Sequence, residues 1–92
     1  MPTHPDARLQ QRILKEIQTI VFEAFEVETP LEPTMSLKRD LKLDSLSTIV
    51  IATELEARFR IKLDEEGDAL VTTVGDLMAL VERRVLALKE RA

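Results

Sequence analysis

Hydrophobic residues recur at steps of three and four over three stretches of this chain, and this spacing predicts amphipathic helices. The first helix is expected from about Asp6 to about Phe25, the second from Asp44 or Ser45 to about Arg60, and the last from Thr73. The faces expected in the core are Leu9, Ile13, Ile17, Ile20, Val21 and Ala24; then Thr48, Ile51, Ala52, Leu55 and Phe59; then Val74, Leu77, Met78, Val81, Val85 and Leu88. Leu14, Phe22 and Phe25 widen the first of these faces.

Residues 26–43 are predicted to form a long connection, because Pro30 and Pro33 prevent a continuous helix. Ser36 is expected to cap a single turn over residues 37–42. Met35, Leu37, Leu41 and Leu43 are expected to hold the connection against the core, as Ile61 and Leu63 hold the segment after the second helix.

A short further helix is expected from Asp64 to about Leu70, with acidic residues at its favourable N-terminal end. Thr73 and Asp76 have capping-box spacing, which marks the start of the last helix. The predicted fold is therefore all-α: a small four-helix bundle of three long helices and one short, with a long loop between the first two. One domain spans residues 1–92, and residues 1–5 are expected to be flexible.

The composition limits the classes of function. The chain has 92 residues, 45% of them hydrophobic, and no cysteine, so one domain with a real core but no disulfide is expected. Residues 44–76 hold eight acids and three bases, a surface that should repel nucleic acid and attract basic partners. No apolar run suits a membrane span or a signal sequence, so the cytoplasm is the expected compartment. The acidic cluster Asp64, Glu65, Glu66 and Asp68 lacks the order of a calcium loop, so no metal site is expected.

Ser45 is the strongest candidate for a functional side chain. It is placed in the first turn of the second helix, where free backbone N–H groups and the helix dipole favour a phosphate. The only histidine is His4, and there is no cysteine, so Ser45 has no evident base to make it a nucleophile. We therefore expect Ser45 to be modified by another protein. The alternative is that Ser45 only caps the helix.

Three segments resemble the acyl carrier protein family. The run Leu41-Lys42-Leu43-Asp44-Ser45-Leu46 is similar to the family's L-G-x-D-S-L signature, with Lys42 where glycine is usual. Residues 54–66 resemble its E-E-x-F and D-E-E stretch, and residues 72–77 resemble the T-V-x-D-L opening of its last helix. The segments occur in the family's order and spacing, and the resemblance covers about residues 9–84.

The resemblance implies a carrier and not an enzyme. Ser45 would carry a 4'-phosphopantetheine arm donated from coenzyme A, whose thiol holds an acyl group for fatty-acid, polyketide or related lipid biosynthesis. A phosphopantetheinyl transferase would recognise Asp44 and Leu46. Acyl-loading, ketosynthase or acyltransferase enzymes would be the other partners of a monomeric carrier. The cations expected to contact the phosphate are Lys38, Arg39 and Lys42.

The second helix departs from the family pattern. Ser47 and Val50 stand where acids are usual, Ala57 and Arg58 continue the loss, and only Glu54 and Glu56 remain as acids along the helix. We hypothesise that partners recognise an apolar stripe, with Glu54 beside it, more than they recognise charge. The stripe consists of Leu46, Ile49, Val50 and Thr53. Two alternatives are drift within an ordinary carrier and packing of the stripe against the long loop.

The residues that could line an acyl pocket between the helices are Leu55, Phe59, Ile61, Val74 and Leu77. Their spacing fits an ordinary hydrophobic core equally well. A peptidyl or aminoacyl carrier stays open, as does a helical interaction module without a prosthetic group. A serine hydrolase lacks its histidine and its nucleophile elbow. A helix-turn-helix DNA binder conflicts with the apolar and acidic second helix.

Overall fold

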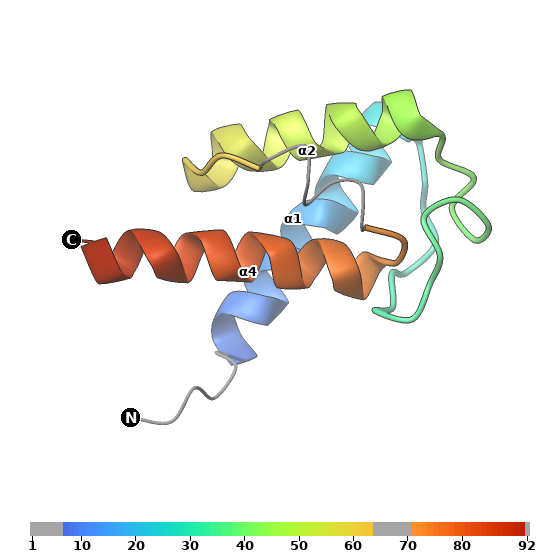
Figure 1. Cartoon of the computed structure of the whole chain (residues 1–92). Coiled ribbons are helices and arrows are strands. Elements are labelled where there is room, and N and C mark those ends of the chain that lie inside the picture. The colour runs from blue at the N-terminus through green and yellow to red at the C-terminus, as the bar shows by residue number, and fades with distance from the viewer. Residues whose placement is uncertain (1–6, 64–70, 92) are drawn as a thin grey trace.

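Three helices make up the part of the chain that the structure, a computed structural model, describes: residues 7–63 and 71–91. They are α1 (Ala7–Phe25), α2 (Ser45–Phe59) and α4 (Val74–Arg91), each within about one residue of its expected bounds. Figure 1 shows α1 crossing behind α2 and α4, whose N-terminal ends lie at the same end of the molecule. The short helix expected at residues 64–70 and the flexible residues 1–5 lie outside the described residues. The all-α class is confirmed there, and the count of four helices stays a prediction.

The core is built from one face of each helix together with the segments that follow α1 and α2. Its buried residues are Leu9, Ile13, Ile17, Ile20 and Val21 of α1; Ile51, Ala52 and Leu55 of α2; Val74, Leu77, Leu80 and Val81 of α4; and Leu31, Leu37, Leu41, Leu43, Ile61 and Leu63 outside the helices. Leu14, Phe25, Met35, Phe59, Met78 and Val85 are half-buried against it. The predicted helical faces and the predicted loop anchors therefore meet in one apolar cluster.

Three residues expected in the core are exposed instead. Phe22 is 52% exposed, because two residues after the buried Ile20 a side chain has turned about 200° around the helix. Ala24 is exposed at the C-terminal end of α1. Leu88 is 44% exposed, near the end of α4 that runs on past α2 in Figure 1.

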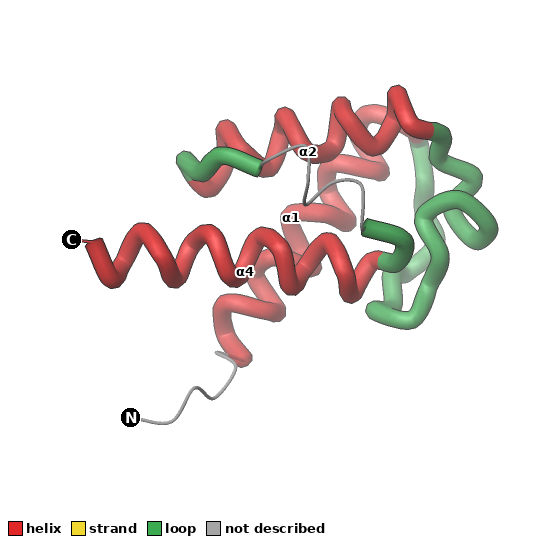
Figure 2. The backbone as a smooth tube through the Cα atoms, viewed as in Figure 1, coloured by secondary structure: helices red, strands yellow, loops and turns green. Residues whose placement is uncertain are grey.

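The long connection between α1 and α2 covers one end of the molecule, beside the start of α4 (Figure 2). As predicted, Ser36 caps a turn: its Oγ accepts the Arg39 N–H at 3.0 Å, and its own N–H donates to the Asp40 carboxylate at 2.6 Å. Ser36 also forms an antiparallel bridge with Thr73, next to the 3.0 Å bond from the Leu37 N–H to the Thr72 carbonyl. The connection is thus fixed to the segment that leads into α4.

The N-terminus of α4 is closed by this connection. The Val74 and Gly75 N–H groups donate to the carbonyls of Met35 at 2.9 Å and Pro33 at 2.8 Å. The predicted capping box is confirmed, with Thr73 Oγ1 accepting the Asp76 N–H at 3.1 Å and the Asp76 carboxylate accepting the Thr73 N–H at 3.0 Å. The first backbone N–H groups of α4 are hydrogen-bonded to carbonyls of the loop. The N-terminus of α2 is therefore the more accessible of the two.

Candidate functional site

Ser45 is the first residue of α2, and Asp44 is the residue that caps the helix. Asp44 has an extended backbone, and its carboxylate accepts the Ser47 N–H at 2.8 Å. Its carbonyl accepts the Thr48 N–H at 3.0 Å. The alternative that Ser45 is present only as the cap is therefore not needed, because the neighbouring residue performs that role.

The Ser45 side chain is exposed, and within the described part of the chain its hydroxyl forms no hydrogen bond. No described side chain is placed to take its proton, and His4 lies outside the described residues. A presented hydroxyl without a base is a substrate for another protein's chemistry and not a nucleophile in its own right.

The Asp44 carboxylate changes the electrostatics expected at this helix start. Its hydrogen bond from the Ser47 N–H holds the pKa of the Asp44 carboxyl below its ordinary value of 3.8, so the group is ionised at neutral pH. The expectation that the amides of the first turn of α2 are free for a phosphate is wrong for Ser47, whose N–H group already donates to Asp44. The negative charge of Asp44 would repel an anion on Ser45, and nearby cations would offset this repulsion.

Such cations lie in the loop just before the site. Lys38, Arg39 and Lys42 are all exposed, and no ion pair holds any of them within the described ranges. Lys38 lines a pocket together with Ser45, whereas Arg39 and Lys42 do not line that pocket. Lys42 has a φ of 56°, the left-handed conformation that favours the glycine usual at this position in the family.

A pocket of about 340 Å³ opens beside Ser45. Its walls come from the loop before α2, the first turn of α2 and the segment before α4, and they consist of Leu37, Lys38, Leu43, Asp44, Ser45, Thr48, Val71 and Thr72. The bond between Leu37 and Thr72 joins two of these walls. Apart from the serine, its cap and Lys38, sequence reasoning missed these residues, because the pairing of residues 36–37 with 72–73 leaves no local signal.

None of the five residues predicted to line an acyl pocket lines the pocket beside Ser45. Leu55, Val74 and Leu77 are buried in the core, and Phe59 is half-buried with the Arg12 guanidinium 5.0 Å from its ring centre. Ile61 lines a different pocket.

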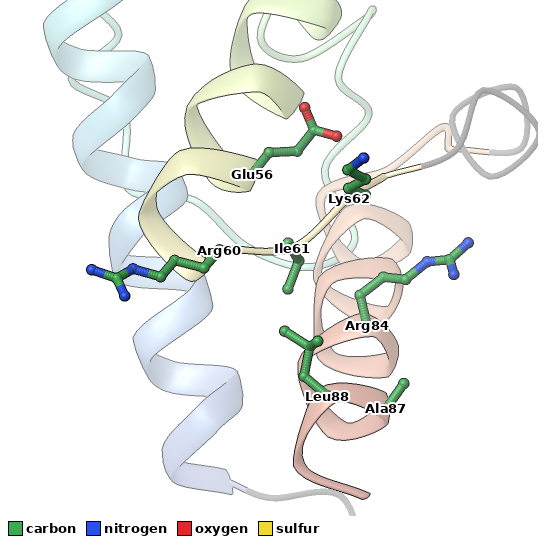
Figure 3. Close-up of a pocket in the computed structure, with 7 residues that line it drawn as sticks. All are labelled: Glu56, Arg60, Ile61, Lys62, Arg84, Ala87 and Leu88. Carbon is green, nitrogen blue, oxygen red and sulfur yellow. The ribbon is translucent and has the colours of Figure 1, made fainter. Parts of the chain in front are cut away.

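This second pocket, of about 540 Å³, lies at the far end of α2 from Ser45 and is drawn in Figure 3. Ile61 and Leu88 point toward each other at its centre, while Arg60 and Arg84 extend away on opposite sides. None of its lining residues is shared with the pocket at Ser45.

The apolar stripe on α2 is exposed. Leu46 is 69%, Ile49 57% and Val50 38% exposed, and Thr53 also faces solvent. The alternative that the long loop covers this stripe is wrong.

The acids that remain on α2 have internal partners. Glu54 lies 3.6 Å from Arg58, which also pairs with Glu16 at 2.8 Å and Glu23 at 3.2 Å on α1. The hydrogen bond to Glu16 raises the pKa of the Arg58 guanidinium further above its ordinary value. Glu56 accepts the Leu63 N–H at 2.8 Å and so holds the chain beyond the helix.

The described residues contain no group of three His, Cys, Asp or Glu side chains that could hold a metal ion, and the acidic cluster at residues 64–68 lies outside them. Within the same residues, none of the helices combines the length and the hydrophobicity of a membrane span.

Comparison with known proteins places these features in a family. A family model described as "Phosphopantetheine attachment site" matches residues 15–81. An acyl carrier protein from Rhodococcus erythropolis is 37% identical over 79 residues, which cover 84% of this chain and 86% of the relative. A meromycolate extension acyl carrier protein from Mycolicibacterium aurum is 33% identical over 78 residues, which cover 84% of this chain and 80% of the relative.

A solved structure from Mycobacterium tuberculosis, assigned as an acyl carrier protein, matches with a TM-score of 0.67 at 29% identity. The match covers 79% of this chain and 93% of that one. The family model and the relatives together identify 4'-phosphopantetheine as the covalent prosthetic group and a carrier role as the function. This chain belongs to the acyl carrier protein family.

Proposed function

We propose that Ser45 bears the 4'-phosphopantetheine arm and that the chain carries an acyl intermediate for lipid biosynthesis. The observation that carries this proposal is the exposed Ser45 hydroxyl, free of any hydrogen bond in the described structure, at the start of α2 within the run Leu41–Leu46. When attached, the arm supplies a thiol that holds the acyl group as a thioester.

The transfer of phosphopantetheine to Ser45 requires no general base from this chain. The Ser45 oxygen forms a bond to the pantetheine-side phosphorus of coenzyme A, and the diphosphate bond to adenosine 3',5'-bisphosphate breaks. The serine proton passes to the transferase, because no described side chain of the carrier is placed to accept it. Asp44 and Leu46 flank the reacting oxygen, and we propose that the transferase recognises both.

The basic loop suits the phosphodiester that results. The ionised Asp44 carboxylate lies beside Ser45 and would repel the negative charge of a phosphodiester on that residue. Nearby cations would offset this repulsion. Lys38 is the best placed, since it lines the same pocket as Ser45, and we assign Arg39 and Lys42 a longer-range contribution. The apolar walls Leu37, Leu43 and Val71 suit the arm or the first carbons of its cargo. The prosthetic group thus fits the residues present.

The cargo is proposed to be a fatty-acyl or related lipid intermediate. Support comes from the relatives, one of which is named for meromycolate extension. Polyketide and peptidyl cargo are the competing assignments within the family.

The first test is the intact mass of the protein after incubation with coenzyme A, Mg²⁺ and a broad-specificity phosphopantetheinyl transferase. Wild type should gain one phosphopantetheine, and Ser45→Ala should gain none. Ser47→Ala is the matched control, because it removes a hydroxyl in the same turn and should be modified like wild type. If neither wild type nor Ser47→Ala gains mass while a known carrier in the same tube does, Ser45 is not a general attachment site, and the chain is either a carrier with a dedicated transferase or a helical interaction module.

We further propose that partner enzymes dock on the stripe Leu46, Ile49, Val50 and Thr53. The fold leaves these side chains in water, and apolar side chains concentrated beside a functional residue are typical of docking surfaces. Ile49→Asp should weaken acyl loading by the cognate enzyme about tenfold or more, because it places a charge where an apolar contact forms. Ala57→Asp, on the same helix beyond the stripe, is the control, and equal loss in both variants would contradict a role for the stripe.

A further inference from the structure

A groove runs between α1 and α2 on the flank of α2 opposite the Ser45 pocket. It measures about 180 Å³ and is lined by Ile20, Glu23 and Ala24 of α1 and by Val50, Glu54 and Arg58 of α2. Its apolar floor comes from Ile20, Ala24 and Val50. Since Val50 also belongs to the exposed stripe, the groove is continuous with that stripe.

The rim of the groove is negatively charged. Arg58 is shared among three carboxylates, with Glu16 at 2.8 Å, Glu23 at 3.2 Å and Glu54 at 3.6 Å. Three carboxylates against one guanidinium leave two negative charges. Glu23 and Glu54 keep 62% and 50% of their side chains exposed, so both remain open to a second cation.

The C-terminal part of α1 carries no cation that would offset this charge. From Glu16 to Phe25 the helix contains two glutamates, Glu16 and Glu23, and neither lysine nor arginine. The acidity that α2 lacks after Ser45 is thus supplied from α1 across the groove, while the loop on the other flank carries Lys38, Arg39 and Lys42.

We infer that this groove docks the cationic surface of the phosphopantetheinyl transferase while the enzyme acts on Ser45. The inference rests on the proposed function. A transferase that binds coenzyme A must place cationic side chains around three phosphate groups, so its active-site mouth is positively charged. A basic side chain of the enzyme would pair with Glu23 and Glu54, and an aliphatic neighbour would enter the groove over Ala24.

The distances suit a single enzyme footprint. Ser45 and Glu54 are nine residues apart, about 14 Å along the helix axis. A standard interface covers about 800 Å² on each partner, a disc of about 16 Å radius, so an enzyme seated over the stripe reaches both flanks of α2. Because the basic loop repels a cationic enzyme, the groove supplies the attraction that orients it.

The experiment measures kcat and KM of phosphopantetheine transfer for each carrier variant at about 50 mM and about 500 mM salt. The variant Glu23→Gln/Glu54→Gln should raise the low-salt KM about fivefold to tenfold with kcat unchanged, and the high salt should remove most of that difference. The matched control Glu28→Gln/Glu32→Gln removes the same net charge from loop positions outside the groove and should change KM less than twofold.

A second pair of variants tests the apolar floor. Ala24→Lys fills the groove and adds a repelling charge, whereas Ala7→Lys makes the same change at the far end of α1. Only the first should raise KM, and circular dichroism should show both folded, because both alanines are exposed helix positions.

Unchanged KM in Glu23→Gln/Glu54→Gln, or an equal rise in its control, would overturn the inference while the proposed function stands. Sedimentation that finds a wild-type dimer dispersed by Ala24→Lys would assign the groove to a second copy and also overturn it. Absence of any modification of wild type would instead defeat the proposed function, and the inference with it.

Discussion

Lys42 adopts a conformation that a lysine rarely takes. Its φ of 56° is the left-handed region, where a Cβ atom is crowded by the backbone, and glycine is usual there in the family. A strained residue three positions before the proposed attachment serine suggests that the charge of the lysine side chain contributes at this site.

Lys42→Gly should therefore stabilise the apo protein by about 0.5–1 kcal/mol, because the relief of strain exceeds the added freedom of the unfolded chain. The urea unfolding midpoint measures this. Lys38→Gly removes the same charge from the same loop at a position without positive φ, and it should lower the midpoint. A midpoint that falls equally in both variants would show that Lys42 is not strained.

At the scale of elements, an aspartate carboxylate accepts backbone N–H groups at the start of both α2 and α4. The Thr73 N–H, and then the Thr72 N–H, hold the pKa of the Asp76 carboxyl below its ordinary value of 3.8. Since the folded pKa is the lower one, the cap stabilises the protein fully above the unfolded pKa. That stability is lost as the pH falls through the folded pKa.

Asp76→Asn should lower the melting temperature at pH 7, and the gap to wild type should narrow as the pH falls through the folded pKa of the Asp76 carboxyl, because protonation removes the same advantage from wild type. The test is the melting temperature of both proteins from pH 7 to pH 2 by circular dichroism. Glu32→Gln removes an exposed carboxylate that accepts no hydrogen bond in the described structure, and it should leave the melting temperature at pH 7 unchanged. A constant gap between wild type and Asp76→Asn at every pH would contradict the prediction.

The helix bounds, their caps and the loop anchors follow from local sequence. These features are predicted by the spacing of hydrophobic residues, by the proline positions and by the spacing of Thr73 and Asp76. All of these signals act within a few residues. The exposure of Phe22 does not follow from local sequence. Hydrophobic periodicity indicates which face of a helix is the most apolar, but not how much of that face the neighbouring helices cover. The groove at Ala24 was missed for the same reason: it needs the α1–α2 packing.

At the scale of the whole molecule, the connection and α4 meet at Gly75. A Cβ on Gly75 would lie 2.9 Å from the Pro33 carbonyl oxygen, and the Gly75 N–H donates to that oxygen at 2.8 Å. The same loop forms a wall of the Ser45 pocket, so the shape of the site depends on this close approach.

Gly75→Ala should destabilise the fold by about 1–3 kcal/mol, although alanine is favoured over glycine in a helix by about 1 kcal/mol. Chemical denaturation measures the sign directly. Ala79→Gly, at an exposed position one turn further along α4, should cost only the helix propensity. Stabilisation by Gly75→Ala would mean that the loop yields at no cost.

The sequence by itself determined the all-α class, the three long helices and their boundaries. It also singled out Ser45 through the run Leu41–Leu46. These rest on periodicity and motif, which are properties of neighbouring residues. Only the tertiary structure decided that the α2 stripe is exposed. It alone placed residues 37–38 and 71–72 beside Ser45 and gathered Glu16, Glu23 and Glu54 around Arg58. Those features join residues far apart in the chain, and no local pattern encodes which of them will meet.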